Sequence, residues 1–326
     1  MTSDVELDPG FQRKPKVRVV RRPLHGVLLL DKPLGLSSND ALQKVKWLLR
    51  AEKAGHTGTL DPLATGVLPL CFGAATKFSQ LQLAADKRYE AVARLGVTTD
   101  TGDAEGAVVL ERAVAVVQAD LDRVREVFLG PIRQLPPMYS ALKKDGKPLY
   151  EYARAGIEVE RQEREVGIHA LKLDLQLNAQ GEKTVRMEVS CSKGTYIRTL
   201  AQDIGEALGC GAHLSVLRRV ATGTFSVLQC VRLDQLEAMD EAQRLARLMP
   251  VDALLDGHTP VTLGDDDAGR FLSGVRRRGN WPDAPRVAVY GEQPRALLGT
   301  AHVRAGELIP GRLLSPLEIK QSLAER

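Results

Sequence analysis

A short loop brings two chemically useful side chains close together. Residues 55–66 read GHTGTLDPLATG, with one imidazole at His56 and one carboxylate at Asp61. Glycine lets the backbone approach a ligand closely, and proline fixes a tight turn. The loop lacks the G-x-x-x-x-G-K spacing of a phosphate-binding P-loop. It is therefore a candidate site for acid, base or nucleophilic chemistry, although a lone aspartate in such a loop is more often a turn or helix-capping residue.

The cysteines and histidines show no metal-binding or redox spacing. The six histidines are scattered, and no H-x-E precedes the P-C-x-x-C of a zinc deaminase. The four cysteines lie at least nineteen residues apart, without a C-x-x-C pair, at Cys71, Cys191, Cys210 and Cys230. We therefore expect reduced thiols in the core and no bound metal ion.

Positive charge gathers in two stretches of a mildly basic chain. The 326 residues carry a formal net charge of +4 and a sequence pI near 8.8. Residues 1–50 hold ten basic and five acidic side chains, and residues 138–156 combine Lys143, Lys144 and Lys147 with half of the six tyrosines. Both stretches suit the phosphates and bases of a nucleic acid. The alternatives are a solvated tail for the first stretch and, for the second, a helical hairpin instead of a mobile arm that orders on RNA.

The hydrophobic pattern predicts the elements that must hold this loop. Residues 26–30 are expected to form a buried strand, and residues 38–51 a helix capped by Ser37 with Asp40. The other expected elements are a strand at 89–97, a hairpin of 171–177 with 185–191, and a helix from 197 to 208 ended by Gly209. Strands that occur singly and as hairpins between helices imply an α+β fold, with a mixed, mainly antiparallel sheet and flanking helices.

The chain is long enough for two domains, at roughly 150 residues for each. We expect a flexible basic arm over residues 1–23, a domain over 24–250 with an insertion near 138–165, and a small β-rich domain over 251–326. No apolar run approaches the roughly 20 residues of a membrane helix. Residues 1–9 lack the basic region and apolar core of a secretory signal. The expected location is the cytoplasm.

Several ordered motifs resemble one enzyme family. Besides the insertion, they are DKP at 31–33 followed by GLSSND at 35–40, GHTGTLDPLATGVLP at 55–69, KRY at 87–89, CSKGTYIRTL at 191–200 and GAHLSVLRR at 211–219. In sequence and spacing they resemble the TruB family of bacterial tRNA pseudouridine-55 synthases over residues 24–250. The resemblance implies the pseudouridine synthase fold. A more diffuse likeness over residues 287–314 implies a PUA-like RNA-binding domain.

The resemblance also implies catalytic roles for three residues. Asp61 would be the catalytic carboxylate of a uridine-to-pseudouridine isomerisation that needs no cofactor, acting as a nucleophile or as the base that takes a proton from C2′. Arg198 is expected to pair with Asp61 and to hold its pKa down. Tyr89 is expected to stack on the target uracil and to help remove the C5 proton. Without the likeness, Tyr89 would be an ordinary strand aromatic and Arg198 a surface ion-pair residue.

Four further positions match the substrate-binding residues of the family. His56 is expected to fill the space left by the flipped nucleotide, while Lys32, Tyr196 and Leu217 are expected to line the pocket. Leu217 fits plain core packing almost equally well. Lys32, the basic arm and the cluster around Lys143 are also expected to contact phosphates.

The implied partner is the T stem-loop of tRNA, read mainly through its folded shape. A monomer is expected, without an obligatory protein partner or a membrane. One alternative is a guide-dependent pseudouridine synthase of the archaeal and eukaryotic type, which would need partner proteins and a guide RNA. The other is a tRNA-folding protein without catalytic activity.

Overall fold

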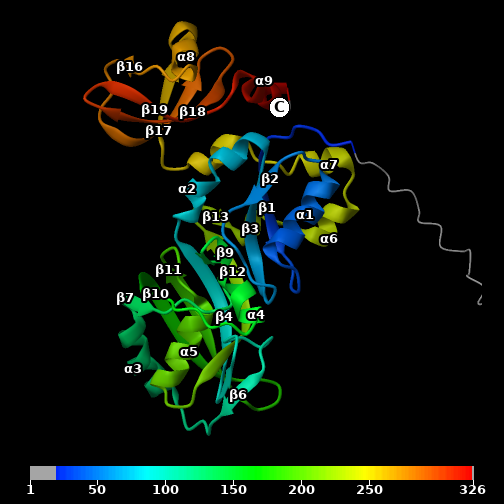
Figure 1. The fold of residues 1–326 in the computed structure, drawn as a ribbon, viewed down its shortest axis with the longest axis vertical. Helices are drawn as coiled ribbons and strands as arrows, with labels where there is room; N and C mark the ends of the chain where they lie inside the picture. Colours follow the sequence, from blue (N-terminus) through cyan, green and yellow to red (C-terminus); the bar gives the residue numbers. More distant parts are fainter. Residues whose placement is uncertain (1–19, 325–326) are drawn as a thin grey trace, which may run out of the picture.

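Two β-sheets, each with its own helices, organise the described part of the chain. The computed structural model describes residues 20–324, so most of the expected arm over residues 1–23 lies outside the described residues. A ten-stranded sheet supports the larger unit, and a five-stranded sheet supports a smaller C-terminal unit (Figure 1). At the start of the described chain, Arg22 pairs with Ala51 in an isolated β-bridge.

The larger sheet is mixed and mainly antiparallel, as expected. Its strands are β1 (Gly26–Lys32), β2 (Ala54–His56), β3 (Ala64–Phe72), β4 (Lys87–Leu95), β7 (Gly130–Gln134), β10 (Arg164–Leu177), β11 (Lys183–Cys191), β12 (Ala212–Thr222), β13 (Phe225–Ser226) and β14 (Val231–Arg232). The order is β14-β1-β3-β12-β4-β11-β10-β7, with β2 added to β3 and β13 to β12. Parallel pairing joins β1 to β14 and β3 to β12. The loop with Asp61 connects β2 to β3, in the middle of this sheet.

Helices flank the larger sheet. They are α1 (Ser38–Leu48), α2 (Ser79–Leu83), α3 (Gln118–Phe128), α4 (Leu149–Arg154), α5 (Ile197–Ala207), α6 (Leu233–Ala238) and α7 (Glu241–Leu245), with 3-10 turns η1 (Gly73–Lys77), η2 (Val227–Gln229) and η3 (Val251–Leu255). Helix α3 packs on β10, and α5 packs on β12 (Figure 1). Helix α1 begins as expected, because the Ser37 hydroxyl accepts a hydrogen bond from the Asp40 backbone N–H. It ends before the expected boundary, since Arg50 adopts a φ of 52°.

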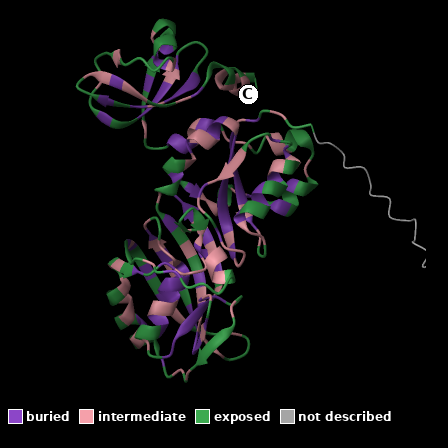
Figure 2. Ribbon diagram, viewed as in Figure 1, coloured by how far each residue is buried: buried purple, intermediate pink, exposed green. Residues whose placement is uncertain are grey.

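The core follows the alternation of the strands. Ala91, Ala93 and Leu95 of β4 are buried on one face, and Figure 2 shows the buried band running along the strands of this sheet. The expected hairpin is present as β10 and β11, with Leu171 opposite Val189 and Leu173 opposite Met187. The expected buried face does not extend to the end of β10 next to the turn. Leu177 lies on the same face as the buried leucines but is 68% exposed.

The basic insertion forms a small β-hairpin and a short helix, so the helical hairpin is wrong. Strands β8 (Lys143–Lys144) and β9 (Lys147–Pro148) pair across a tight turn, and α4 follows directly. The turn residues Asp145 and Gly146 both have positive φ, which glycine and aspartate tolerate better than most residues. The tyrosine rings contact the basic residues, with the Lys147 ammonium 4.9 Å from the Tyr152 ring centre.

A second small hairpin projects from the larger unit. Its strands, β5 (Val97–Thr99) and β6 (Val108–Glu111), pair only with each other. All residues of β6 are exposed, including three apolar ones, as Figure 2 shows at the end of the molecule opposite the C-terminal unit. The connecting loop carries Asp103, which is 3% exposed. This loop is tied to the larger sheet by a hydrogen bond from the Ala104 N–H to the Leu214 carbonyl.

The C-terminal unit shares its core with the larger unit. Its elements are β15 (Thr259–Leu263), α8 (Asp265–Leu272), β16 (Arg277–Arg278), β17 (Ala284–Gly291), β18 (Ala296–Arg304), β19 (Glu307–Leu313) and α9 (Pro316–Ala324), with sheet order β15-β17-β18-β19-β16. One buried cluster contains Val27, Val67 and Phe78 of the larger unit together with Leu297 and Leu314 of the smaller one. The expected β-rich unit is therefore present, packed on its neighbour through apolar side chains.

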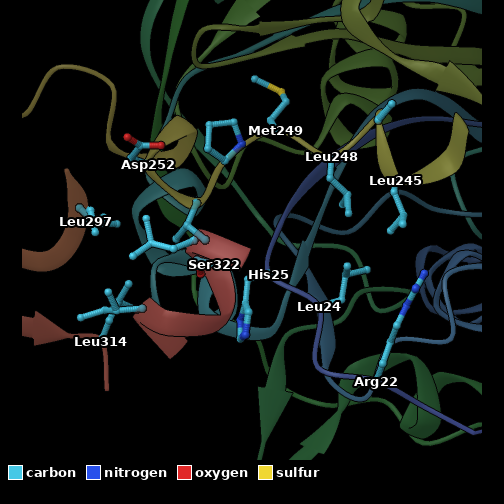
Figure 3. Close-up of a pocket in the computed structure, with 16 residues that line it drawn as sticks. Arg22, Leu24, His25, Leu245, Leu248, Met249, Asp252, Leu297, Leu314 and Ser322 are labelled. Carbon is cyan, nitrogen blue, oxygen red and sulfur yellow. The ribbon is translucent and has the colours of Figure 1, made fainter. Parts of the chain in front are cut away.

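A cavity of about 680 Å³ lies between the two units. Figure 3 shows Leu245 and Leu248 on one side, with Leu297 and Leu314 across the gap beside α9. Its lining is largely aliphatic, and it lies apart from the loop with Asp61. No helix in the described range 20–324 has both the length and the apolar character needed to span a membrane.

The close approach between Gly66 and β12 predicts a sharp stability difference between two glycines. At Gly66, φ is +101° and an added Cβ would lie 2.2 Å from the Arg219 carbonyl oxygen, whereas at Gly35, φ is +82° and no atom lies within 4 Å of the added Cβ. Gly35→Ala should cost about 1–3 kcal/mol from backbone strain. Gly66→Ala should cost about 1–3 kcal/mol more, from overpacking against the strand. Thermal unfolding of the two variants tests this; equal losses would mean that β12 moves aside without cost.

Candidate active site

The start of α1 holds the loop that carries Asp61. The Ser38 side chain, buried at the first turn of α1, donates to the Leu60 carbonyl at 3.0 Å and accepts from the Leu60 N–H at 2.7 Å. The Gly35 N–H donates to the Pro62 carbonyl at 2.9 Å. These contacts hold the backbone on both sides of Asp61, so the direction of its side chain is set by the loop.

Arg198 connects Asp61 to two other segments of the chain. Its Nη2 lies 2.9 Å from Asp61 Oδ2 and its Nη1 3.4 Å from Asp103 Oδ2. It also donates to the Thr101 carbonyl at 3.0 Å and to the Tyr139 carbonyl at 2.6 Å. The expected ion pair between Asp61 and Arg198 is therefore present, within a larger network that includes a second carboxylate.

The two carboxylates of this network differ in access. The side chain of Asp61 is 36% exposed, while those of Arg198 and Asp103 are 6% and 4% exposed. Asp61 is thus the carboxylate that reaches the cavity, and Asp103 lies behind the guanidinium. A carboxylate with this placement can act on a bound ligand as a nucleophile or a proton acceptor.

The pKa of Asp61 is raised, against the expectation that Arg198 holds it down. Burial in the cavity disfavours the charged carboxylate and is the largest cause. The Arg198 guanidinium and the Lys32 ammonium favour the charge, but Asp103 adds a like charge that opposes it. The sequence motifs indicated the pair of Asp61 and Arg198. They gave no sign of the second carboxylate, Asp103, or of how far the site is buried.

A cavity of about 480 Å³ opens at Asp61. It is lined by five of the seven expected site residues, namely Asp61, Tyr89, Tyr196, Arg198 and Leu217. They come from the β2–β3 loop, β4, the segment before α5, α5 itself and β12. The volume falls within the range of roughly 300–1,000 Å³ that is typical of small-ligand pockets.

Lys32 and His56 do not line this cavity. Lys32 is fully buried, and its Nζ donates to the Pro33 and Leu36 carbonyls, so the expected phosphate contact by Lys32 is wrong. Burial lowers the pKa of Lys32 to about 8, although its charge still favours ionisation of Asp61. His56 Nδ1 is buried without a hydrogen-bond partner, and burial lowers the pKa of the ring. The role expected for His56 beside a flipped nucleotide stays a prediction.

Sequence reasoning missed Arg219, a second arginine of the cavity wall. It is 1% exposed and lies directly opposite Tyr89 in the register of β12 with β4. A signal was present, because Arg218 and Arg219 are adjacent on a strand and must point to opposite faces. Arg218 meets Asp31 through two hydrogen bonds, at 2.7 and 3.0 Å, while Arg219 points into the site.

Two other contributors were also missed. Asp103 had no distinguishing signal among the acidic residues of its loop. Gln134, at the end of β7, holds the Tyr196 backbone from both sides: its amide donates to the Tyr196 carbonyl at 3.2 Å and accepts from the Tyr196 N–H at 3.0 Å. In the described part of the chain, no group of three or more histidine, cysteine or acidic side chains could hold a metal ion.

Two family models cover most of the larger unit. Residues 46–197 match the description "TruB family pseudouridylate synthase (N terminal domain)", and residues 198–256 match "tRNA pseudouridylate synthase B C-terminal domain". Neither match extends into the second sheet, so the likeness of that unit to a PUA domain stays a prediction.

Similar proteins and structures extend the match to nearly the whole chain. "tRNA pseudouridine synthase B" of Verminephrobacter eiseniae is 64% identical over 95% of this chain and 95% of its own length, and the protein of that name from Cupriavidus pinatubonensis is 61% identical over 94% and 99%. A solved Cbf5-Nop10-Gar1 complex matches with a TM-score of 0.67 and 26% identity, over 96% of this chain and 92% of the matched chain. The geometry around Asp61, the family models and the identity to these relatives together show that the chain belongs to the TruB family of pseudouridylate synthases.

Proposed function

We propose that this protein converts uridine to pseudouridine at position 55 in the T-loop of tRNA. Its family consists of pseudouridylate synthases, and relatives above 60% identity are named tRNA pseudouridine synthase B. The observation that carries the proposal is one carboxylate, Asp61, which faces a cavity and is held by the buried Arg198. This arrangement suits an isomerisation that needs no net oxidation or reduction.

The chemistry requires three changes at the bound nucleotide. The bond between N1 and C1′ breaks, the uracil turns in the cavity, and C5 bonds to C1′ before the C5 proton leaves. Asp61 in its ionised form would either add to the sugar or take the C2′ proton, while Arg198 keeps it charged and oriented. Tyr89, on the wall formed by β4, would lie against the uracil ring. Tyr196 and Leu217 would complete the pocket around the base.

The target uridine must leave its stack to reach Asp61, since the reacting atoms are covered by neighbouring bases in folded RNA. The exposed basic hairpin formed by β8 and β9 is placed to contact the RNA backbone, because Ser140, Ala141 and Leu142, just before it, line the same cavity. We infer that the C-terminal unit binds another part of the tRNA, in the manner of a PUA domain. It shares a buried cluster with the larger unit, so deleting it would expose apolar core.

A guide-dependent synthase is the second candidate, favoured by the likeness to the Cbf5-Nop10-Gar1 complex. The two candidates differ in what the protein needs. Purified protein alone should form pseudouridine in an unmodified tRNA transcript, mapped by position. Product that forms only with added guide RNA and partner proteins would favour the second candidate, and tight binding without product would favour a tRNA-folding protein.

Replacing Asp61 tests the catalytic assignment. Asp61→Asn keeps size and polarity but removes the charge, so pseudouridine formation in single-turnover assays should fall below detection. Binding of tRNA should be equal or slightly tighter, because an anion has left an RNA site. Thermal stability should be unchanged or higher, since burial disfavours the charged carboxylate and Arg198 keeps its contacts with Asp103, Thr101 and Tyr139.

Glu206→Gln is the matched control, because Glu206 pairs with Arg112 on the surface, away from the cavity. It should retain full activity. Substantial product from Asp61→Asn under single turnover would show that Asp61 is a structural turn residue.

The raised pKa of Asp61 predicts an acid limb in the rate profile. The active form is ionised, so the single-turnover rate should fall as pH drops through a pKa above the ordinary value near 3.8. Asp103 raises that pKa, so Asp103→Asn should move the limb to lower pH. The same substitution should slow the reaction at neutral pH by roughly 10-fold or more, because Arg198 loses one partner of a buried ion pair and holds Asp61 less firmly. A limb that does not move would mean that Asp61 does not control it.

The basic hairpin predicts a change in salt dependence. Lys143, Lys144 and Lys147 are exposed, and each lost phosphate contact should reduce the slope of log affinity against log salt by about 0.7–0.9. Replacing all three with alanine should therefore flatten the salt dependence of tRNA binding in filter-binding assays. Lys172→Ala, on the exposed side of β10 beside Asp174, is the control. An unchanged slope for the triple variant would place the RNA elsewhere.

A further inference from the structure

Arg219 occupies an unusual place for a fully charged side chain. It lies on β12, is 1% exposed, and lines the cavity together with Asp61 and Tyr89. Its Nε donates to the Val67 carbonyl at 2.8 Å, and its Nη2 donates to the Gly58 carbonyl at 3.2 Å. The guanidinium is therefore held rigidly, between β3 and the loop that carries Asp61.

Within the described part of the chain, this buried cation has no carboxylate partner. In the described range 20–324, no carboxylate oxygen lies within 4.0 Å of an Arg219 nitrogen, whereas Arg198 meets Asp61 and Asp103, and Arg218 meets Asp31. Removing an ion from water is costly unless it gains compensating interactions. Arg219 donates to two backbone carbonyls and lies directly opposite Tyr89 across β12 and β4, so its positive charge is left to act on whatever forms beside Tyr89.

The last step of the proposed reaction needs a base in this cavity. When C5 has bonded to C1′, its proton must leave so that the C5–C6 double bond is restored. Of the ionisable groups on the wall, Asp61 acts at the sugar, and the Lys87 ammonium donates to the Leu83 and Ala85 carbonyls. Two phenols remain, Tyr89 and Tyr196, and of these Tyr89 lies directly opposite Arg219 across β4 and β12. Burial raises the pKa of the Tyr89 hydroxyl, and the Arg219 charge opposes part of that rise.

Resting on the proposed function, we propose that Arg219 is a positioning residue for proton removal: it stabilises the Tyr89 phenolate that takes the proton from C5. The phenol first loses its proton to solvent. The phenolate oxygen then accepts the C5 proton, and the C5–H electron pair restores the C5–C6 double bond. The pair of the C6–N1 double bond moves to N1, which takes a proton from water, and Tyr89 is left as the neutral phenol. The guanidinium stays charged throughout and lowers the free energy of the Tyr89 phenolate before the transfer.

Two substrates separate this step from the earlier ones. With [5-²H]uridine in the T-loop, a slow proton removal appears as a primary isotope effect. With 5-fluorouridine, C5 carries no proton, so formation of the C5–C1′ bond is measured without the final step. Arg219→Gln should slow pseudouridine formation about 10–100-fold, below the 10²–10⁴-fold that a whole general base contributes. It should also show an isotope effect larger than that of the wild type, and rearrange 5-fluorouridine at nearly the wild-type rate.

Further variants connect the effect to Tyr89. Tyr89→Phe keeps the ring but removes the oxygen, so it should show the same isotope effect, and adding Arg219→Gln to it should slow the reaction little further. Arg219→Lys restores a cation and should recover part of the rate, and it replaces the Gln variant if that variant does not fold. Arg218→Lys, the neighbour on the opposite face of β12, is the control and should behave as wild type.

The competing interpretation is that Arg219 only fixes the loop through Gly58 and β3 through Val67. In that case Arg219→Gln and Arg219→Lys would slow the 5-fluorouridine reaction as much as the uridine reaction, without a new isotope effect, and this result would overturn the proposal. Additive losses in the double variant with Tyr89→Phe would overturn it as well. Wild-type protein that forms no pseudouridine would instead refute the proposed function itself.

Discussion

A buried guanidinium that must find partners is the constraint on which the site depends. Arg198 lies in the first turn of α5, where the helix dipole disfavours a cation, and its side chain is 6% exposed. Its cost of burial is offset only if several acceptors converge on it. They come from the Asp61 loop, the β5–β6 loop and the insertion after β7. Three segments distant in sequence are thereby brought to one point, and the cavity is the space that they enclose.

Strict alternation made β4, β10 and β11 of the central sheet predictable from sequence, and a buried apolar run indicated β1, whereas β3 and β12 were not expected. The leucines of β10 and the apolar residues of β11 alternate with polar ones, and a sheet with one buried face requires that pattern. The cap of α1 and the glycine after α5 were equally readable, because both satisfy specific backbone groups. For the insertion, the helical alternative was wrong. A two-residue hairpin has too few residues to show a period, although its Asp-Gly turn was a usable sign.

The candidate site was predictable in its residues and less so in its energetics. The motifs marked Asp61 and Arg198, and the pair is present. A short sequence motif does not show how deeply its residues are buried. Neither the raised pKa of Asp61 nor the complete burial of Lys32 could therefore be anticipated. Both follow from the number of elements that cover the site, which is a tertiary quantity. Asp103 and Gln134 act through contacts made across the fold, and single-sequence spacing carries no trace of such contacts.

The exposed β5–β6 hairpin makes one side of the site easier to open than the rest. Isolated two-stranded hairpins are marginally stable in water, and this one buries none of β6. Its loop nevertheless supplies Asp103 and the Thr101 carbonyl to Arg198. Local opening of this ribbon would remove two of the acceptors of Arg198 while the rest of the sheet remains folded. The order of Asp61 is thus linked to a hairpin whose outer strand is fully exposed, and the arrangement around Arg198 would be lost by subglobal opening before the fold is lost.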